Sequence, residues 1–117
     1  MPSRSASPCD GWSRRVSDLF GEEYFLRGEA MGLSCYTDYS WQPEPTRAMA
    51  AAIAGHCGFV GDYQERILDF GCARGYLVRA LVEQGIDAVG VDVSEWAVAN
   101  PDHTVRDIVR KIYSEYN

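Results

Sequence analysis

The sequence predicts an α/β chain in which a helical N-terminal part precedes one strand–helix–strand–helix unit. Two short apolar runs, at residues 66–70 and 87–93, have the length and the bounding turns of buried strands. Each run is followed by apolar residues at helical spacing, as in a pair of parallel strands joined by a right-handed crossover helix. The region before them shows helical spacing broken by glycine and proline.

Size and charge limit the class of protein. The 117 residues allow one domain, and a hydrophobic content of 46% indicates a globular chain. The net charge is −6, with a single lysine beside ten arginines, which argues against a nucleic-acid partner bound through a broad basic surface. No apolar run approaches the roughly 20 residues of a membrane helix, and no signal peptide is recognisable. We therefore expect a soluble, cytoplasmic protein with no membrane partner.

The four cysteines show no metal-binding or disulfide pattern. Cys9, Cys35, Cys57 and Cys72 contain no C-x-x-C pair and no regular spacing. His56 precedes Cys57 directly, and adjacent residues rarely chelate one ion together. We expect separate, reduced thiols and no metal site.

Before the first strand, two regions are expected. Residues 1–11 are rich in serine and proline and predict a flexible tail. Residues 12–65 predict a helical lead-in or lid region, which begins with a helix over 12–20. Residues 22–41 have no clean period and predict an ordered loop with a helical turn near Glu29. Five aromatic residues of this loop either cover a bound ligand or pack across the sheet: Tyr24, Phe25, Tyr36, Tyr39 and Trp41.

A longer helix is expected after Pro43 and Pro45. Thr46 can cap it, and Gly58 ends it. Four residues at helical spacing are expected on its packed face: Met49, Ala52, Ile53 and His56. The histidine on this face is interpreted as a core-edge residue rather than a ligand.

The strand–helix–strand unit follows. Between the two strands, residues 76–84 predict a helix with Leu77, Ala80 and Leu81 facing inward and Gly85 in the left-handed position after its end. The run 87–93 is nearly all apolar, as in a strand covered on both faces.

Two further helices are expected after the second strand. Ser94 can cap a short helix over 95–100. A final helix is predicted because apolar residues recur at helical spacing: Val105, Ile108, Val109, Ile112, Tyr113 and Tyr116.

The turn after the first strand has the chemistry of a ligand site. A strand that ends in a glycine turn and restarts as a helix directs backbone N–H groups at one spot above the sheet edge. The dinucleotide pattern G-x-G-x-x-G is not met, because Ala73 and Tyr76 replace the second and third glycines. An NAD-dependent oxidoreductase is therefore the weaker interpretation. The pattern D-x-G-x-x-x-G is met by Asp69, Gly71 and Gly75, and Asp92 stands at the end of the next strand.

The stretches DFGCARG and VGVDVSEWAVAN resemble class I S-adenosylmethionine-dependent methyltransferases over residues 66–100. The resemblance implies a partial Rossmann-like domain over 66–117 and S-adenosyl-L-methionine as the cofactor. It also implies a set of cofactor-binding positions: Asp69, Gly71, Cys72, Ala73, Gly75, Asp92 and Val93.

These residue types suit that cofactor. A carboxylate such as Asp69 is compatible with a cationic ammonium and sulfonium, where a pyrophosphate would be repelled. Gly71 lets the backbone approach the ligand because no Cβ intrudes. Asp92 offers acceptor oxygens to two ribose hydroxyls, and Val93 would flank the adenine. Cys72 is interpreted as a packing or backbone position, since no base stands beside it.

The expected function is methyl transfer to an unidentified small molecule or another non-nucleic-acid acceptor. The resemblance gives no catalytic residue, because the substrate wall in that family comes from strands beyond the second acid. A full domain of this type also has more strands than the sequence predicts here, so the chain is interpreted as truncated. We expect a second copy or a partner chain to cover the open sheet edge. The alternative is a non-catalytic module that keeps a nucleoside pocket.

Overall fold

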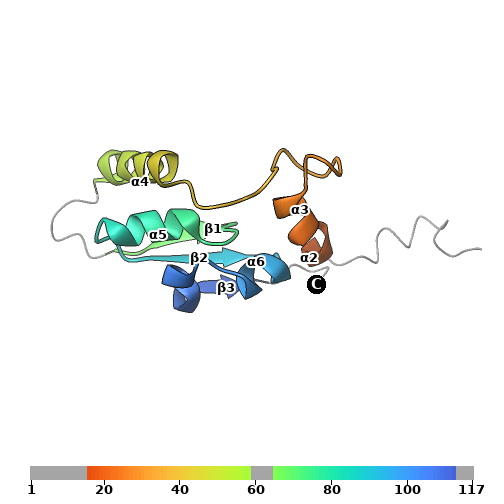
Figure 1. Ribbon diagram of the computed structural model, residues 1–117. Coiled ribbons are helices and arrows are strands. Elements are labelled where there is room, and N and C mark those ends of the chain that lie inside the picture. The colour runs from red at the N-terminus through yellow and green to blue at the C-terminus, as the bar shows by residue number, and fades with distance from the viewer. Residues whose placement is uncertain (1–15, 59–64, 113–117) are drawn as a thin grey trace, which may run out of the picture.

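A computed structural model describes residues 16–58 and 65–112 of the chain (Figure 1). The described elements, in chain order, are α2 (Val16–Leu19), α3 (Glu22–Leu26), α4 (Pro43–Cys57), β1 (Ile67–Phe70), α5 (Tyr76–Glu83), β2 (Ala88–Asp92), α6 (Glu95–Ala99), the 3-10 helix η2 (His103–Ile108) and β3 (Val109–Lys111). The predicted strand–helix–strand–helix order is confirmed from β1 to α6. With its small parallel sheet, the structure fits the predicted partial Rossmann-like fold.

The described strands form one parallel sheet in the order β1–β2–β3. Gly90 of β2 pairs with Asp69 on one side and with Val109 on the other. Parallel pairing brings the carboxyl ends of the strands to the same edge of the sheet. The turns that follow β1 and β2 therefore lie side by side, which is where ligands bind in open α/β sheets.

One face of the sheet is covered by helices. α5 packs against β2, and α4 packs on α5 as an outer layer (Figure 1). Buried alanines on both helices, among them Ala50, Ala54 and Ala80, leave room for this close approach. The buried core joins both helices, the strands and η2: Ala50, Ala54, Cys72, Val78, Ala80, Leu81, Ile86, Ala88, Val105 and Val109.

The other face of the sheet is open among the described residues. Side chains alternate between faces along a strand, and Leu68 and Phe70 of β1 point away from the core, 56% and 70% exposed. Their partners on β2, Val89 and Val91, are only partly buried. The expectation of a strand covered on both faces is therefore wrong within the described part of the chain. An apolar run also fits a strand with one face covered and the other left half open.

The predicted packed face of α4 is wrong except for Ile53, which packs against the core. Met49 is 54% exposed and His56 is exposed, whereas Ala50 and Ala54 are buried. Alanines occur on every side of this helix, so its sequence does not mark one strongly apolar face. The close approach of α5 determines which side is buried. The helix also begins three residues before Thr46, at Pro43. Prolines are tolerated in a first turn because the N–H groups there have no partner within the helix.

The lead-in contains a helix where a loop was predicted. α3 spans Glu22–Leu26, and residues near Glu29 form turns instead. Two acids in its first turn stabilise the helix, because they lie at the positive end of its dipole. Phe25 is buried and anchors the helix. Of the helix predicted over 12–20, the structure shows Val16–Leu19, and residues 12–15 lie outside the described part.

The last predicted helix is wrong in type. Residues 103–108 form the 3-10 helix η2, and Val109–Lys111 add a third parallel strand beside β2. The backbone N–H of Ile112 donates to the Asp92 carbonyl oxygen at 2.9 Å, which extends this pairing. Val105 and Val109 are both buried, and a four-residue spacing cannot separate a helix from a turn followed by a strand. Tyr113 and Tyr116 lie outside the described residues.

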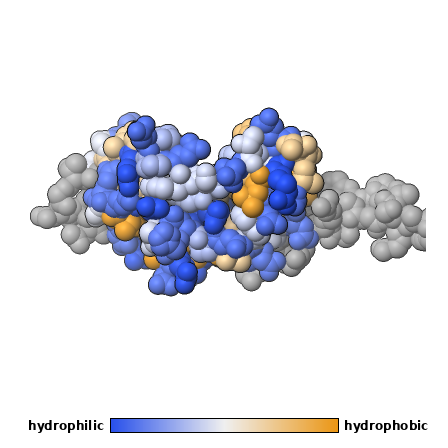
Figure 2. Space-filling view, in the orientation of Figure 1, coloured by the Kyte–Doolittle hydropathy of each residue, from blue (hydrophilic) through white to orange (hydrophobic). Residues whose placement is uncertain are grey.

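The surface seen in Figure 2 is mostly hydrophilic, with hydrophobic side chains in small separate patches. Within residues 16–58 and 65–112, every helix is too short or too polar to cross a membrane.

Candidate functional site

The turn after β1 folds back over the end of β2. The N–H groups of Gly71 and Cys72 both donate to the Val91 carbonyl oxygen, at 2.8 and 2.9 Å. Three residues of the turn have left-handed backbones: Gly71 (φ 88°), Ala73 (φ 51°) and Gly75 (φ 87°). Glycine adopts this conformation freely, so two of the three positions explain why the sequence turns sharply here.

The two glycines of the turn have different surroundings. A Cβ placed on Gly71 would meet no atom within 4 Å, so the backbone there borders open space. A Cβ on Gly75 would lie 2.8 Å from methyl groups of both Val105 and Val109. Gly71 leaves room for a ligand, whereas Gly75 lets α5 begin against η2 and β3.

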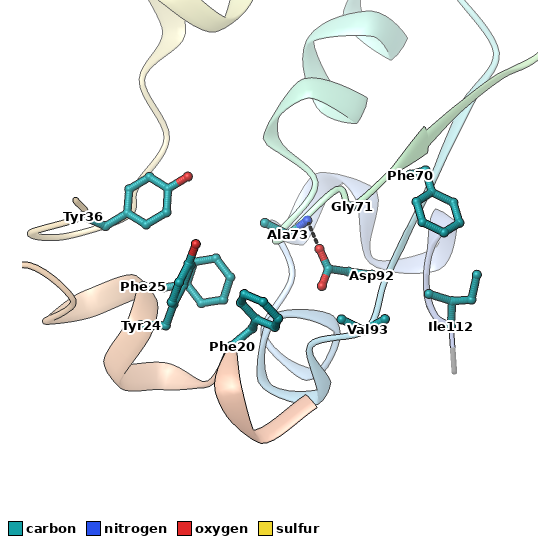
Figure 3. A pocket seen from close by; sticks show the side chains of 10 residues that line it. All are labelled: Phe20, Tyr24, Phe25, Tyr36, Phe70, Gly71, Ala73, Asp92, Val93 and Ile112. Carbon is teal, nitrogen blue, oxygen red and sulfur yellow. Dashed lines mark hydrogen bonds between the residues drawn. The ribbon is translucent and has the colours of Figure 1, made fainter. Parts of the chain in front are cut away.

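Asp92, at the end of β2, ties two turns together. Its Oδ2 accepts the Ala73 N–H at 2.7 Å, and its Oδ1 accepts the Ser94 N–H at 2.7 Å. Figure 3 shows the first of these bonds at the border of a cavity. A carboxylate can accept about four hydrogen bonds, so each oxygen keeps a free lone pair for a ligand.

Asp69 brings a second carboxylate to the same region. Burial, with a smaller contribution from the Asp92 carboxylate, raises the pKa of Asp69 above its ordinary value. No hydrogen bond or ion pair within the described residues engages the Asp69 side chain. Two acids thus converge near the turn, and a positively charged ligand would relieve their repulsion.

A cavity of about 280 Å³ lies beside the turn (Figure 3). One side comes from the strand ends and the residues that follow them: Phe70, Gly71, Ala73, Asp92, Val93 and Ile112. The other side, here called the aromatic wall, comes from α3 and the segments next to it: Phe20, Tyr24, Phe25 and Tyr36.

Contacts with α6 hold the aromatic wall over the strand ends. The Ser94 hydroxyl donates to the Phe20 carbonyl oxygen, and the Glu95 N–H donates to Ser17 Oγ at 3.0 Å. The Phe25 ring stacks on Trp96 of α6, with centroids 5.5 Å apart. The wall is therefore fixed to the α/β unit by polar and aromatic contacts.

The structure separates the predicted cofactor-binding residues into two groups. Gly71, Ala73, Asp92 and Val93 line the cavity. Asp69, Cys72 and Gly75 do not line it, although Asp69 lies close enough to Asp92 for their charges to interact.

Cys72 occupies a packing position. It is buried, and a Cβ on Gly90 would meet its Sγ at 2.6 Å. Burial raises the pKa of the Cys72 thiol to about 12, which leaves it protonated and unsuited to act as a nucleophile.

Several cavity residues were not predicted from the sequence. Phe20 fell at the end of the helix expected over 12–20, and Ile112 fell in the final helix that the structure replaces with η2 and β3. Phe70 follows Asp69 directly and could have been found from its place at the end of the strand. Of the five predicted lid aromatics, Tyr24, Phe25 and Tyr36 line the cavity. Tyr39 stacks on Tyr76 instead, and Trp41 lies under Arg79.

Comparison with known proteins identifies the family of the chain. Residues 36–113 match the family described as the methyltransferase domain. A 46-residue stretch is 39% identical to the ubiquinone biosynthesis O-methyltransferase of Azoarcus sp. (strain BH72). That stretch covers 39% of this chain and 18% of the relative, so the alignment spans less than a fifth of the relative's length. Since the family match covers more than half of the sequence, the chain belongs to the methyltransferase-domain family, as a class I member.

Proposed function

We propose that the chain is the cofactor-binding part of a methyltransferase that uses S-adenosyl-L-methionine. The methyl acceptor would be a small molecule or another non-nucleic-acid compound. The observation that carries the proposal is the pairing of Asp69 and Asp92 beside a glycine turn whose first glycine borders open space. S-adenosyl-L-methionine supplies a reactive methyl group on a cationic sulfonium.

The residues present fit this cofactor. A Cβ at Gly71 would fill the space that the turn leaves open, so the backbone can approach a ligand closely. Asp92 would accept ribose hydroxyls with its remaining lone pairs, and Val93 would lie against the adenine. Asp69 would balance the positive charge of the amino-acid end. The aromatic wall would exclude water from the reacting centre.

The charge of the site supports an acceptor other than a polyanion. Among the described residues, the cavity lining holds one charged residue, Asp92, and no arginine or lysine. The whole chain carries a net charge of −6. A nucleic-acid acceptor would need a positive surface, which these residues do not supply. Exposed free thiols at Cys35 and Cys57 support a reducing compartment such as the cytoplasm as the place of action.

Calorimetric titration with S-adenosylhomocysteine and S-adenosyl-L-methionine tests the proposal. We expect saturable binding to the folded chain and a clear loss of affinity in Asp92→Ala and Asp69→Asn. Asp69→Asn is the sharper variant, because the Asp92 carboxylate also holds the backbone of two turns.

Asp87→Asn is the matched control, since Asp87 is exposed and pairs with Arg66 on the surface. It should bind as the unchanged chain does. Absence of binding to the folded protein, or affinity that is indifferent to both site variants, would refute the proposal.

A further inference from the structure

The aromatic wall brings several ring surfaces to the cavity. The Phe20 and Tyr24 rings meet edge to face at 5.1 Å, and Tyr24 and Tyr36 do so at 5.8 Å. In Figure 3 the rings stand on one side of the cavity, with Ala73 and Asp92 on the other. The face of an aromatic ring is electron-rich and attracts a cation placed within about 6 Å of its centre.

Arginines in the described part of the chain contact aromatic rings away from the wall. Arg79 lies 4.0 Å from the ring centre of Trp41, and Arg74 lies 5.4 Å from that of Trp96. No described arginine or lysine lies over the four rings of the aromatic wall. Their faces are therefore not already used by a described protein cation.

The opposite side of the cavity adds negative charge. The Asp92 carboxylate lines it, and Asp69 lies close enough for the two charges to interact. A cation between the wall and the strand ends would have the rings of Tyr24 and Tyr36 on one side and the Asp92 carboxylate on the other. Asp69 would add its charge from outside the lining. The Asp92 side chain is buried, so its attraction for a cation is stronger than that of a carboxylate at an exposed surface.

We propose that the aromatic wall, chiefly Tyr24 and Tyr36, makes the site prefer the cationic sulfonium of S-adenosyl-L-methionine over the neutral thioether of S-adenosylhomocysteine. This inference rests on the proposed function and assigns the wall a binding role that depends on charge. The consequence is that the wall loses its charge-dependent attraction for the ligand when the methyl group is transferred, which favours product release.

The test compares dissociation constants of both ligands for the full chain, measured by calorimetry. The variants are Tyr36→Leu and Tyr24→Leu, which remove a ring, with Tyr36→Phe and Tyr24→Phe as matched controls that keep it. The donor also carries an extra methyl group, and a leucine variant changes the apolar contact of that methyl group together with the charge interaction. The fluorinated series described next separates the two contributions, because it keeps the shape of the ring. The preference is the dissociation constant for S-adenosylhomocysteine divided by that for S-adenosyl-L-methionine. We expect this ratio to fall by roughly three- to tenfold in the leucine variants and to stay unchanged in the phenylalanine variants.

A second measurement decides the matter if a leucine variant fails to fold. Fluorinated phenylalanines placed at position 36 keep the shape of the ring and progressively weaken the negative charge of its face. The preference for the donor should then fall step by step with fluorine content, while affinity for S-adenosylhomocysteine stays nearly constant.

Two results would overturn the inference while leaving the proposed function intact. In one, the leucine variants weaken both ligands by the same factor, which would show that the rings provide only apolar contact. In the other, preference does not change along the fluorinated series. Failure of the unchanged chain to bind either ligand is a different result, which would refute the proposed function and this inference with it.

Discussion

Gly71 and Gly75 share a left-handed backbone, but substitutions at the two positions should have separable effects. Gly75→Ala would force a methyl group to 2.8 Å from two buried valines and strain the backbone at φ 87°. We expect it to lower the free energy of unfolding by about 2–4 kcal/mol, as overpacking and a left-handed alanine together predict. Gly71→Ala adds backbone strain alone, about 1–2 kcal/mol, because nothing lies within 4 Å.

Urea denaturation of both variants, followed by calorimetry with S-adenosylhomocysteine, checks this prediction. Gly71→Ala should stay folded and lose affinity, since its new methyl group enters the space beside the turn. Equal stability losses at the two positions would contradict the assignment of a packing role to Gly75 and a binding role to Gly71.

Asp69 should make stability depend on pH in the opposite sense to a salt-bridged acid. Its pKa is raised in the folded state, by burial first and by Asp92 second. The folded chain therefore binds the Asp69 proton more tightly than the unfolded chain does. This contribution to stability is fully present below the unfolded pKa, near 4, and is lost as pH rises through the folded pKa.

The variant Asp69→Asn tests this sign. At pH 7 it should melt at a higher temperature than the unchanged chain, because it removes a carboxylate whose charge is disfavoured by burial and by the nearby Asp92. The difference should shrink as the pH falls toward 4. A variant that melts lower at pH 7 would show that the Asp69 charge stabilises the fold, contrary to the expected linkage.

At the scale of residues, the positions around the turn were predictable where the signal is local, and their role in binding stays a prediction. Glycines at positions 71 and 75 mark the turn, and Asp69 and Asp92 lie at or next to the ends of strands. The spacing of these four residues in the sequence was therefore enough to locate them. The aromatic wall depends on contacts such as Phe25 with Trp96, which join residues far apart in the chain. Spacing could suggest aromatic residues as a lid, but it could not tell which rings would reach the cavity.

At the scale of elements, Ser94 serves both α6 and the lead-in. Its Oγ accepts the Ala97 N–H at 3.0 Å as the helix cap, and its hydroxyl donates to the Phe20 carbonyl oxygen. We expect Ser94→Ala to lower the free energy of unfolding by about 1–3 kcal/mol, from a lost cap and a buried carbonyl left without its donor. Hydrogen exchange should also accelerate at residues 17–26.

Ser17→Ala provides the matched comparison. It removes the acceptor of the Glu95 N–H and leaves the Ser94 cap in place. Its effect on hydrogen exchange should be confined to the lead-in and the start of α6. Unchanged exchange of the lead-in in both variants would show that the aromatic stacking alone holds it.

The elements that the sequence predicted correctly have strong local signals. β1, α5 and β2 combine apolar runs, a helix period and glycines at their ends. α4 was found, but not its buried side, because alanine fits either face. β3 was mistaken for a helix because Val105 and Val109 stand four residues apart, and only their packing against Gly75 reveals the turn between them.

At the scale of the whole molecule, the exposed side of the sheet leads to a prediction about behaviour in solution. β1 pairs on one side only among the described strands, and Leu68 and Phe70 are 56% and 70% exposed. An unpaired strand with exposed apolar residues favours association with another strand. We propose that a second copy or a partner chain covers this edge.

Light scattering across a range of protein concentrations checks the proposal. We expect the chain alone to oligomerise or to be poorly soluble, and Leu68→Lys with Phe70→Lys to shift it toward the monomer. A monomeric profile of the unchanged chain, with a single cooperative melt, would contradict it.

The contacts that hold the aromatic wall also lead to an expected order of folding. The Ser94–Phe20 and Glu95–Ser17 hydrogen bonds join residues 74 and 78 positions apart, whereas β1, α5 and β2 are close neighbours in sequence. Contacts at such separation form late, because the intervening chain must first be ordered. The lead-in is synthesised first, yet it has no docking surface until α6 exists. We therefore expect the cavity to be completed late in folding, with the glycine turn in place before the wall that closes over it.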